Sequence, residues 1–433
     1  MTSRFIYLIY FYSVFGFSQN QFTLSGSIYE SEGQETLIGA NIIFPKLSTG
    51  ATTNEYGFYS ITLPEGSYDV KVSYLGYSSI SKTIILNKNL TQNFSLEANS
   101  DTLDEILLKT DAERVNIKTA QMSVNTLNSN TIKQIPVVFG EADLVKAITL
   151  LPGISSGGEG TAGFNVRGGS NDQNLILLDE ATLFNSSHLF GFFSVFNPDA
   201  IKNLKLYKGG IPAKYGGRVA SVLDIYQKEG NKNKFCANGG IGLVSSRVLF
   251  EGPLEKEKGS FLFGGRSTYA HLFLPLFDID NIAYFYDINT KLSYRLDVHN
   301  KIYLSGYFGR DVFNVSNSFK NTYGNTVVNF RWNHLFSDKL FSNLSLIYSD
   351  YYYGLDLNFV GFKWNSGIQN MNVKFDLKQY LNDSFSLEYG LHSTYYGFNP
   401  GIIKPNGPTS GINREELTKK NAFENAVYLD IKQ

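Results

Sequence analysis

Residues 167–225 read RGGSNDQNLILLDEATLFNSSHLFGFFSVFNPDAIKNLKLYKGGIPAKYGGRVASVLDI, and this stretch decides the fold. Gly168 and Gly169 precede the apolar run NLILLD, and glycine pairs mark turns that need positive φ or a close backbone approach. NLILLD, IKNLKLYKGG and RVASVLDIYQ have the pattern of strands. Upstream, EADLVKAITLLPG predicts a short helix that ends at Pro152-Gly153. Residues 115–230 are therefore predicted to form a compact mixed α/β domain.

The composition of the whole chain restricts its class. The 433 residues leave room for about two to four domains. A formal net charge of −1 offers no basic surface for nucleic acid. With 15% aromatic and only 18% charged residues, the chain is too aromatic for a disordered protein. Beyond the N-terminus there is no run of about 20 apolar residues, so no mature transmembrane helix is expected, whereas a membrane β-barrel fits.

Residues 1–18 have the pattern of a secretory signal peptide. Arg4 supplies a short positive region, residues 5–17 are apolar, and the small residues Gly16 and Ser18 precede Gln19. The alternatives are a buried strand or an uncleaved anchor.

Residues 19–98 are predicted to form a small β-sandwich. Short β-rich segments such as FTLSGSIY and SYDVKVSYL alternate with glycines at about ten-residue spacing. The block resembles the carboxypeptidase-regulatory-like family in Gly39-Ala40-Asn41, Pro64-Glu65-Gly66-Ser67-Tyr68 and Ser73-Tyr74-Leu75-Gly76-Tyr77. A zinc peptidase needs clustered His and Glu ligands, and this block has no histidine.

From about residue 235 the pattern changes to long hairpins. DINTKLSYRLDV places Ile288 and Leu292 on one face and Asn289 and Lys291 on the other, which also suits a soluble sandwich. Strands of more than about ten residues favour a membrane barrel instead. Short turns at DVHN, FSDK and LNDS alternate with long loops expected at 314–325, 355–368 and 399–422. Residues 231–433 are therefore predicted to form part of a transmembrane barrel of about nine strands.

The stretch 167–225 resembles the plug signature of TonB-dependent outer-membrane receptors that carry a carboxypeptidase-regulatory-like domain. The resemblance implies a mainly β chain: a β-sandwich, a mixed α/β plug, and the first part of an antiparallel barrel whose relatives have about 22 strands. It implies plug–barrel contacts at Arg167, Gly168, Gly169 and Arg218, where both arginines could pair with barrel carboxylates. For each arginine an ordinary solvated side chain is the alternative. It places a substrate-facing plug loop at Asn185, His188, Phe190 and Phe192. For His188 a structural role in the loop is the alternative.

The linker, residues 99–114, carries one apolar patch. Asp104, Glu105, Ile106, Leu107, Leu108 and Lys109 could begin a helix, form the last strand of the sandwich, or be an extended peptide that pairs with a partner strand. The patch resembles a TonB box and lies where the family has one.

The resemblance implies an energised importer in the bacterial outer membrane, with its N-terminal domain in the periplasm. TonB and its inner-membrane complex, outer-membrane lipid and an imported small ligand are the expected partners, with no nucleic acid and no cofactor. The expected cargo is a bulky scarce nutrient such as a siderophore or metal chelate. A glycan or peptide importer with a surface lipoprotein, and a passive porin or adhesin, are the alternatives.

Catalysis and metal binding are not expected. The histidines are His188, His271, His299, His334 and His392, and none has HExxH spacing. The single cysteine, Cys236, can form neither an internal disulfide nor a thiolate zinc site.

Two features depart from the family. The chain stops at Gln433, within a predicted strand, so we expect a fragment of a longer receptor. If EGPLEKEKGS is a periplasmic turn, an additional strand is needed before residue 237.

Overall fold

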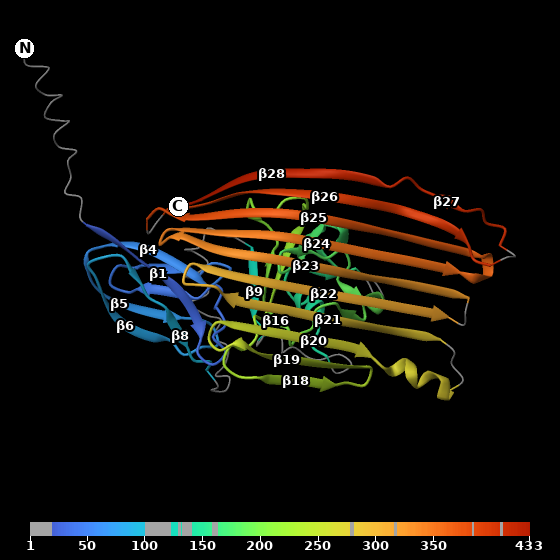
Figure 1. Ribbon diagram of the computed structural model, residues 1–433, viewed down its shortest axis with the longest axis horizontal. Coiled ribbons are helices and arrows are strands. Elements are labelled where there is room, and N and C mark those ends of the chain that lie inside the picture. The colour runs from blue at the N-terminus through green and yellow to red at the C-terminus, as the bar shows by residue number, and fades with distance from the viewer. Residues whose placement is uncertain are drawn as a thin grey trace, which may run out of the picture.

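The structure is a computed structural model that describes residues 20–99, 123–128, 131, 141–157, 163–277, 281–315, 318–382, 385–407 and 410–433. A sandwich domain lies at one end of a curved sheet of long strands, and a mixed domain lies inside the curve (Figure 1). The signal-like segment and the box-like patch at 104–109 lie outside the described residues.

The sandwich domain, residues 20–99, packs two small sheets face to face. Its core includes Ile28, Ile42, Tyr59 and Leu96, all buried, and Tyr59 donates its hydroxyl proton to the carbonyl of Gln92 at 2.6 Å. One sheet contains β4 (Phe58–Pro64), β1 (Gln21–Glu30), β7 (Leu90–Thr91) and β8 (Phe94–Leu96). The other contains β3 (Thr49–Thr52), β2 (Asn41–Phe44), β5 (Gly66–Ser73) and β6 (Ile80–Leu86).

The plug, whose described part spans residues 123–128, 131, 141–157 and 163–227, is built on a mixed five-stranded sheet. Its order is β13 (Ala181–Thr182), β12 (Asn174–Leu178), β17 (Ser221–Gln227), β16 (Ile201–Tyr207) and β9 (Val124–Asn128). β12 and β17 are parallel and the other pairs are antiparallel. Smaller elements are α4 (Leu144–Thr149), β10 (Ile154–Ser156), β11 (Phe164–Val166), η1 (Asn171–Gln173), β14 (Ser187–His188), η2 (Leu189–Gly191) and β15 (Phe193–Ser194).

Local chemistry explains how the plug elements begin and end. Asp143 caps α4 by accepting the amide proton of Lys146 at 2.9 Å, and its second oxygen accepts from the amide of Ser194 at 2.7 Å. A Cβ on Gly169 would lie 2.6 Å from the Cβ of Ala220, so the turn before β12 needs glycine for a close approach. One core of buried aliphatic residues and Phe164 and Phe196 joins the helix to the sheet.

The wall is an eleven-stranded sheet that curls around the plug (Figure 1). Neighbouring strands are antiparallel, and most have more than ten residues. The strands are β18 (Cys236–Ile241), β19 (Ser245–Glu255), β20 (Gly259–Thr268), β21 (Ile282–Arg295), β22 (Asn300–Val315), β23 (Phe319–Ser337), β24 (Leu340–Leu357), β25 (Phe362–Tyr380), β26 (Ser386–Pro405), β27 (Glu415–Glu416) and β28 (Lys420–Lys432). Short helices η3 (Ala270–Leu272), η4 (Leu274–Phe277) and η5 (Asn358–Val360) lie in the connections.

The wall has a polar buried face and an apolar exposed face, which is the reverse of a sheet in a soluble protein. On β24, Asn343 and Ser345 point inward and are 1% and 0% exposed, whereas Leu346 points outward and is 46% exposed. On β21, Lys291 is buried and Leu292 is exposed. An apolar outer band around a polar interior is the pattern of a membrane-spanning barrel wall.

The fold class is confirmed, but the expected loops are too long. Residues 314–315 and 319–325 belong to β22 and β23, and residues 355–357 and 362–368 belong to β24 and β25. Likewise, residues 399–405 and 420–422 are strand. Two wall strands, β18 and β19, precede the turn at residues 256–258, but both lie within residues 236–255, so the additional strand expected before residue 237 is not found there among the described residues. Among the described residues, no helix has the length and apolar character required to cross a membrane.

Candidate functional site

The apical loop of the plug, residues 183–194, reaches the wall at mid-sheet. Leu189 and Phe190 both have left-handed backbone, with φ of 46° and 55°, which is uncommon outside glycine. The turn leaves Phe190 39% and Phe192 54% exposed. Strained backbone persists where surrounding contacts hold it, and it often marks a functional site.

His188 anchors this loop rather than facing solvent. It is 1% exposed and bridges two wall carboxylates: Nδ1 lies 2.6 Å from Asp311 on β22, and Nε2 lies 3.1 Å from Asp287 on β21. The ring stacks on Phe285 at 4.2 Å. Burial lowers the pKa of His188, but the charge of Asp311 and the hydrogen bonds to Asp287 and Asp311 outweigh burial and raise it overall. His188 therefore links the plug to two wall carboxylates, and its raised pKa favours the charged form of the ring.

Arg266 extends this link to a second plug element. Its guanidinium lies 2.6 Å from Asp287, 3.0 Å from Glu141 and 2.7 Å from the carbonyl of Ser194. Ser245 also donates to Glu141 at 2.7 Å. Arg266, Glu141 and Asp287 are all at least nine-tenths buried, so removing one partner would leave a buried charge uncompensated.

A second buried ion-pair network joins the plug turn at Asp179 and Glu180 to the wall. Both residues have left-handed backbone, with φ of 47° and 71°. Asp179 pairs with Lys291 at 3.0 Å, and Glu180 pairs with Lys374 at 3.3 Å and with Arg331 at 3.7 Å. Burial alone would raise the pKa of Glu180. The charges of Lys374 and Arg331 lower this pKa by more than burial raises it, so the carboxyl stays ionised.

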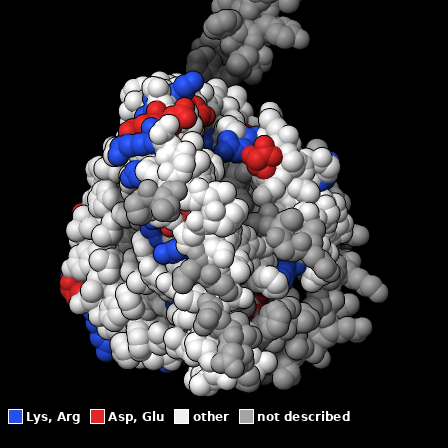
Figure 2. Space-filling view, turned by 90° about the vertical axis from the view of Figure 1, so that its right-hand side faces the viewer, with Lys and Arg blue, Asp and Glu red and all other residues white. Residues whose placement is uncertain are grey.

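Above the apical loop the lumen is aromatic. The ring of Phe190 meets Phe313 edge-on at 5.3 Å, and its amide donates to the hydroxyl of Tyr323 at 2.9 Å. Phe184 contacts Tyr351 at 6.5 Å. Figure 2 views the molecule from the end with the long connections, where Lys, Arg, Asp and Glu gather at the top and most of the remaining described surface is uncharged. This vestibule offers apolar and stacking contacts to a ligand.

The residues expected in the substrate-facing loop separate into two groups. Phe190 and Phe192 are exposed in the vestibule. Asn185 and His188 hold the loop instead: the amide of Asn185 donates to Asn325 at 3.4 Å, its carbonyl accepts from Asn325 at 2.8 Å, and His188 is buried.

The expected ion pairs of the two arginines with the barrel are not found among the described residues. Arg167 is exposed in a left-handed turn, with φ of 50°, and its guanidinium donates to Ser123 of the plug at 2.8 Å. Arg218 is exposed and donates to the carbonyl of Gly217 at 2.7 Å. Gly168 has positive φ and Gly169 packs against Ala220, so both serve the plug itself. The turn at Arg218 lies beside β28, since a Cβ on Gly217 would lie 3.5 Å from Glu424 Oε1, but the exposed guanidinium forms no ion pair there among the described residues.

Sequence reasoning missed the carboxylates and cations that do join the plug to the wall. Asp287, Lys291 and Asp311 lie on the polar face of alternating strands, and a charge that faces a plugged lumen needs a partner. That signal identifies the wall side of each pair but not its partner in the plug. Among the described residues, no group of three or more His, Cys, Asp or Glu side chains is arranged to hold a metal ion.

Comparison with known proteins identifies the first two domains and the fold. Residues 24–108 match the CarboxypepD_reg-like domain, and residues 116–222 match the TonB-dependent receptor plug domain. No curated protein matches the chain. Similar solved structures include the siderophore receptor PirA from Pseudomonas aeruginosa, at 17% identity with a TM-score of 0.51, over 72% of this chain and 53% of that chain.

Two further structures have a similar fold. The copper transporter OprC is 11% identical with a TM-score of 0.55, over 72% of this chain and 53% of that chain. FpvA of P. aeruginosa, bound to a heterologous pyoverdine, is 12% identical with a TM-score of 0.55, over 72% of this chain and 49% of that chain. The chain thus spans about half the length of the solved structures that it matches, and at these identities the likeness shows the fold.

Proposed function

We propose that this chain, which carries a TonB-dependent receptor plug domain behind a CarboxypepD_reg-like domain, works as a TonB-dependent transporter of the bacterial outer membrane. The observation that carries the proposal is a plug joined by buried ion pairs to the polar inner face of a wall whose outer face is apolar. A wall of this polarity suits lipid outside and a filled channel inside.

The cargo that we propose is a bulky, scarce nutrient of the siderophore or metal-chelate class. The aromatic vestibule over Phe190 supports a ligand with extended apolar surface. Structural neighbours include a receptor described as a siderophore receptor and a copper transporter. A glycan or peptide importer with a surface lipoprotein is the second candidate, because sugars also stack on aromatic rings. A passive porin or adhesin would not need the buried links between plug and wall.

Energy would reach the plug through TonB and its inner-membrane complex. The box-like patch Asp104–Lys109 lies outside the described residues, directly before the plug and after the sandwich domain. This order supports our proposal that the sandwich domain lies in the periplasm, where a strand of TonB would pair with the patch.

Proline at Ile106 or Leu107 tests the coupling. Proline removes a backbone donor, so strand pairing with TonB should fail. We expect cells that express the variant receptor to lose uptake of a radiolabelled ferric siderophore while its binding at the cell surface persists. Ala112→Pro, in the same linker but outside the patch, should leave uptake unchanged.

Normal uptake in both box variants would place the box elsewhere, nearer residue 119. A lipoprotein that co-purifies with the receptor, together with uptake of an oligosaccharide instead of the ferric siderophore, would favour the second candidate.

A further inference from the structure

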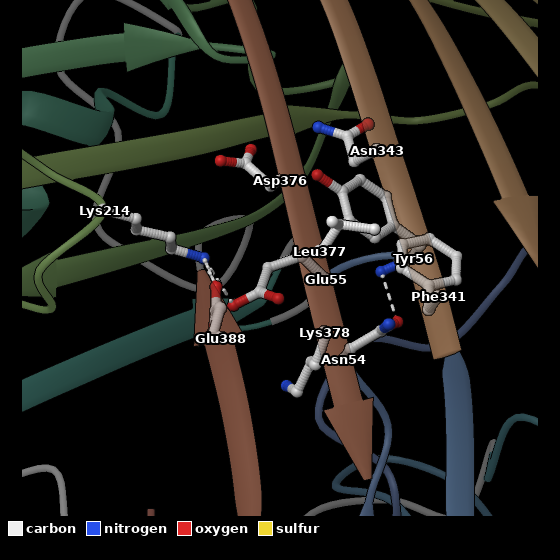
Figure 3. Close-up of a pocket in the computed structure, with 10 residues that line it drawn as sticks. All are labelled: Asn54, Glu55, Tyr56, Lys214, Phe341, Asn343, Asp376, Leu377, Lys378 and Glu388. Carbon is white, nitrogen blue, oxygen red and sulfur yellow. Dashed lines mark hydrogen bonds and ion pairs between the residues drawn. The ribbon is translucent and has the colours of Figure 1, made fainter. Parts of the chain in front are cut away.

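The sandwich domain extends one loop between the plug and the wall. Residues 53–58, here called the clasp loop, connect the two sheets of the domain. Asn54 accepts the amide protons of Tyr56 and Phe58 at 2.9 and 3.0 Å, which stiffens the loop. Glu55 and Tyr56 project from this turn toward Lys214 and Glu388 and toward Phe341 (Figure 3).

Glu55 binds two lysines of the plug. Its carboxylate lies 3.2 Å from Lys214 and 3.5 Å from Lys205 on β16, and Lys214 also lies 3.3 Å from Glu388 of the wall. Burial alone would raise the pKa of Glu55, but Lys214 and Lys205 hold it well below its usual range. Three bodies therefore share one set of buried charges.

Tyr56 and Phe58 fix the same loop to the wall. The Tyr56 hydroxyl donates to Glu180 of the plug at 2.9 Å, and its ring stacks on Phe341 at 5.1 Å. Phe58 stacks on Phe341 at 5.8 Å and meets Tyr380 at 6.1 Å. The clasp loop thus ends in an aromatic cluster on β24 and β25.

A second line of contacts lies beside the loop. Thr36 donates to Glu229 at 2.7 Å, and Glu35 pairs with Lys202 of the plug at 3.3 Å. Ser25 donates to Asp338 in a turn of the wall at 2.9 Å. Contacts on several sides fix the orientation of the domain and not only its distance from the plug.

Beside the aromatic cluster, the junction is polar. A cavity of about 20 Å³ lies among Glu55, Tyr56, Lys214 and Asp376, and another of about 10 Å³ lies among Lys202, Glu229 and Arg331. Each has room for about one water molecule and has polar groups to bind it. An interface of charges and water can separate and be rehydrated, unlike an apolar core.

We propose that the sandwich domain is a clasp: through Glu55 and Tyr56 it holds the plug against the wall and keeps β16 and the Glu180 turn in place. This deepens the proposed function, since the clasp would set how readily the plug moves. Its physical content, protection of the plug by the clasp loop, is independent of transport.

Hydrogen exchange on the purified chain in detergent tests the clasp. In Glu55→Gln and in Tyr56→Phe, we expect amides of β16 and β12 to exchange at least tenfold faster than in the unmodified chain, while β1 and β4 of the sandwich keep their rates. Glu65→Gln, an exposed carboxylate on the same domain, is the matched control and should change neither set.

A double-mutant cycle separates the clasp from a general loss of stability. Lys214→Gln should accelerate plug exchange as Glu55→Gln does, and the double variant should accelerate it less than the two single effects combined, because the two residues share one ion pair although each also has a second partner. Unchanged β16 exchange in both single variants, or fully additive effects, would overturn the proposal. If β1 and β4 also exchange faster in Glu55→Gln, the Tyr56→Phe variant decides.

Because neither measurement needs import, absence of siderophore uptake would contradict the proposed transporter and leave the clasp standing. Conversely, normal uptake together with fast exchange of the plug amides in the unmodified chain would support the transporter and contradict the clasp.

Discussion

The single side chain of His188 makes several of the contacts between the plug and the wall. Its ring nitrogens reach Asp287 and Asp311, which lie on neighbouring strands of the wall, and its ring covers Phe285. The amide of Leu189 adds a bond to Asp311 at 2.8 Å. Arg266 pairs with Asp287 and Glu141 but not with Asp311. His188 is therefore the cationic partner that compensates the buried charge of Asp311.

Replacing His188 with alanine should loosen the apical loop. It leaves Asp311 buried without its cation, at a cost of about 3–5 kcal/mol. Exchange of the amides of residues 186–195 should accelerate by at least tenfold. Adding Asp311→Asn should recover part of the loss, because the uncompensated charge disappears. A double variant no better protected than His188→Ala would show that packing on Phe285, not charge, is what His188 supplies.

The pH dependence follows from the raised pKa of His188. A group whose pKa is higher in the folded state stabilises fully below its ordinary value, near 6.5, and loses this contribution as pH rises through the folded value. Protection of residues 186–195, corrected for intrinsic exchange, should therefore fall as pH rises above that value. His188→Ala should lack this fall.

At the scale of elements, the alternation of apolar and polar residues predicts the wall strands but does not predict where they end. The period-two pattern correctly places Ile288 and Leu292 on one face and Asn289 and Lys291 on the other. The polar, Asn- and Tyr-rich ends of β22 to β26 were expected to be loops, because outside the apolar band a strand keeps its backbone ladder but loses its apolar signature. Hydrogen-bond registers with neighbouring strands, which one sequence does not reveal, decide those ends.

The lipid-facing band predicts a depth-dependent penalty. Leu346 lies on the outer face at mid-strand, so Leu346→Arg should destabilise the receptor by about 2–4 kcal/mol in phospholipid vesicles. Thr322→Arg, on the same face but near the end of β23, should cost about 0–1 kcal/mol. Denaturant titration of both variants measures the difference. Equal costs would mean that this face does not cross the bilayer where we place it.

At the scale of the whole molecule, the sandwich domain, the plug and the wall meet at a charged junction that no local sequence pattern predicts. Sandwich, plug and wall each follow from strand and turn signals, because those depend on neighbouring residues. The site does not: His188 and Asp311 are 123 positions apart, and Tyr56 and Glu180 are 124 apart. The exposed aromatic tip at Phe190 was predicted, whereas the ion pairs behind it require the assembled fold.

Glu30 makes the stability of this assembly sensitive to pH. Burial, with Glu35 and Glu32 nearby, raises the pKa of Glu30 to about 7. Stability from the protonated form is complete below the ordinary value of 4.5 and is lost as pH rises through about 7. Glu30→Gln should match the unmodified chain in Tm near pH 4 and exceed it at pH 8, with Glu65→Gln as the control. An equal difference in Tm at both pH values would contradict this assignment.

The plug sheet also has a mechanical consequence. β9 is an edge strand: it follows the linker and, among the described residues, pairs only with β16, through the five residue pairs from Asn203–Asn128 to Tyr207–Val124. A pull on the chain before Val124 therefore reaches the domain through this ladder and through the bonds that Ser123 accepts from Arg167 and from the amide of Lys208. Force along β9 loads all of its hydrogen bonds at once and meets high resistance, whereas force across it breaks them singly. The direction of the pull, more than its size, would then decide whether the plug yields strand by strand or moves as one body.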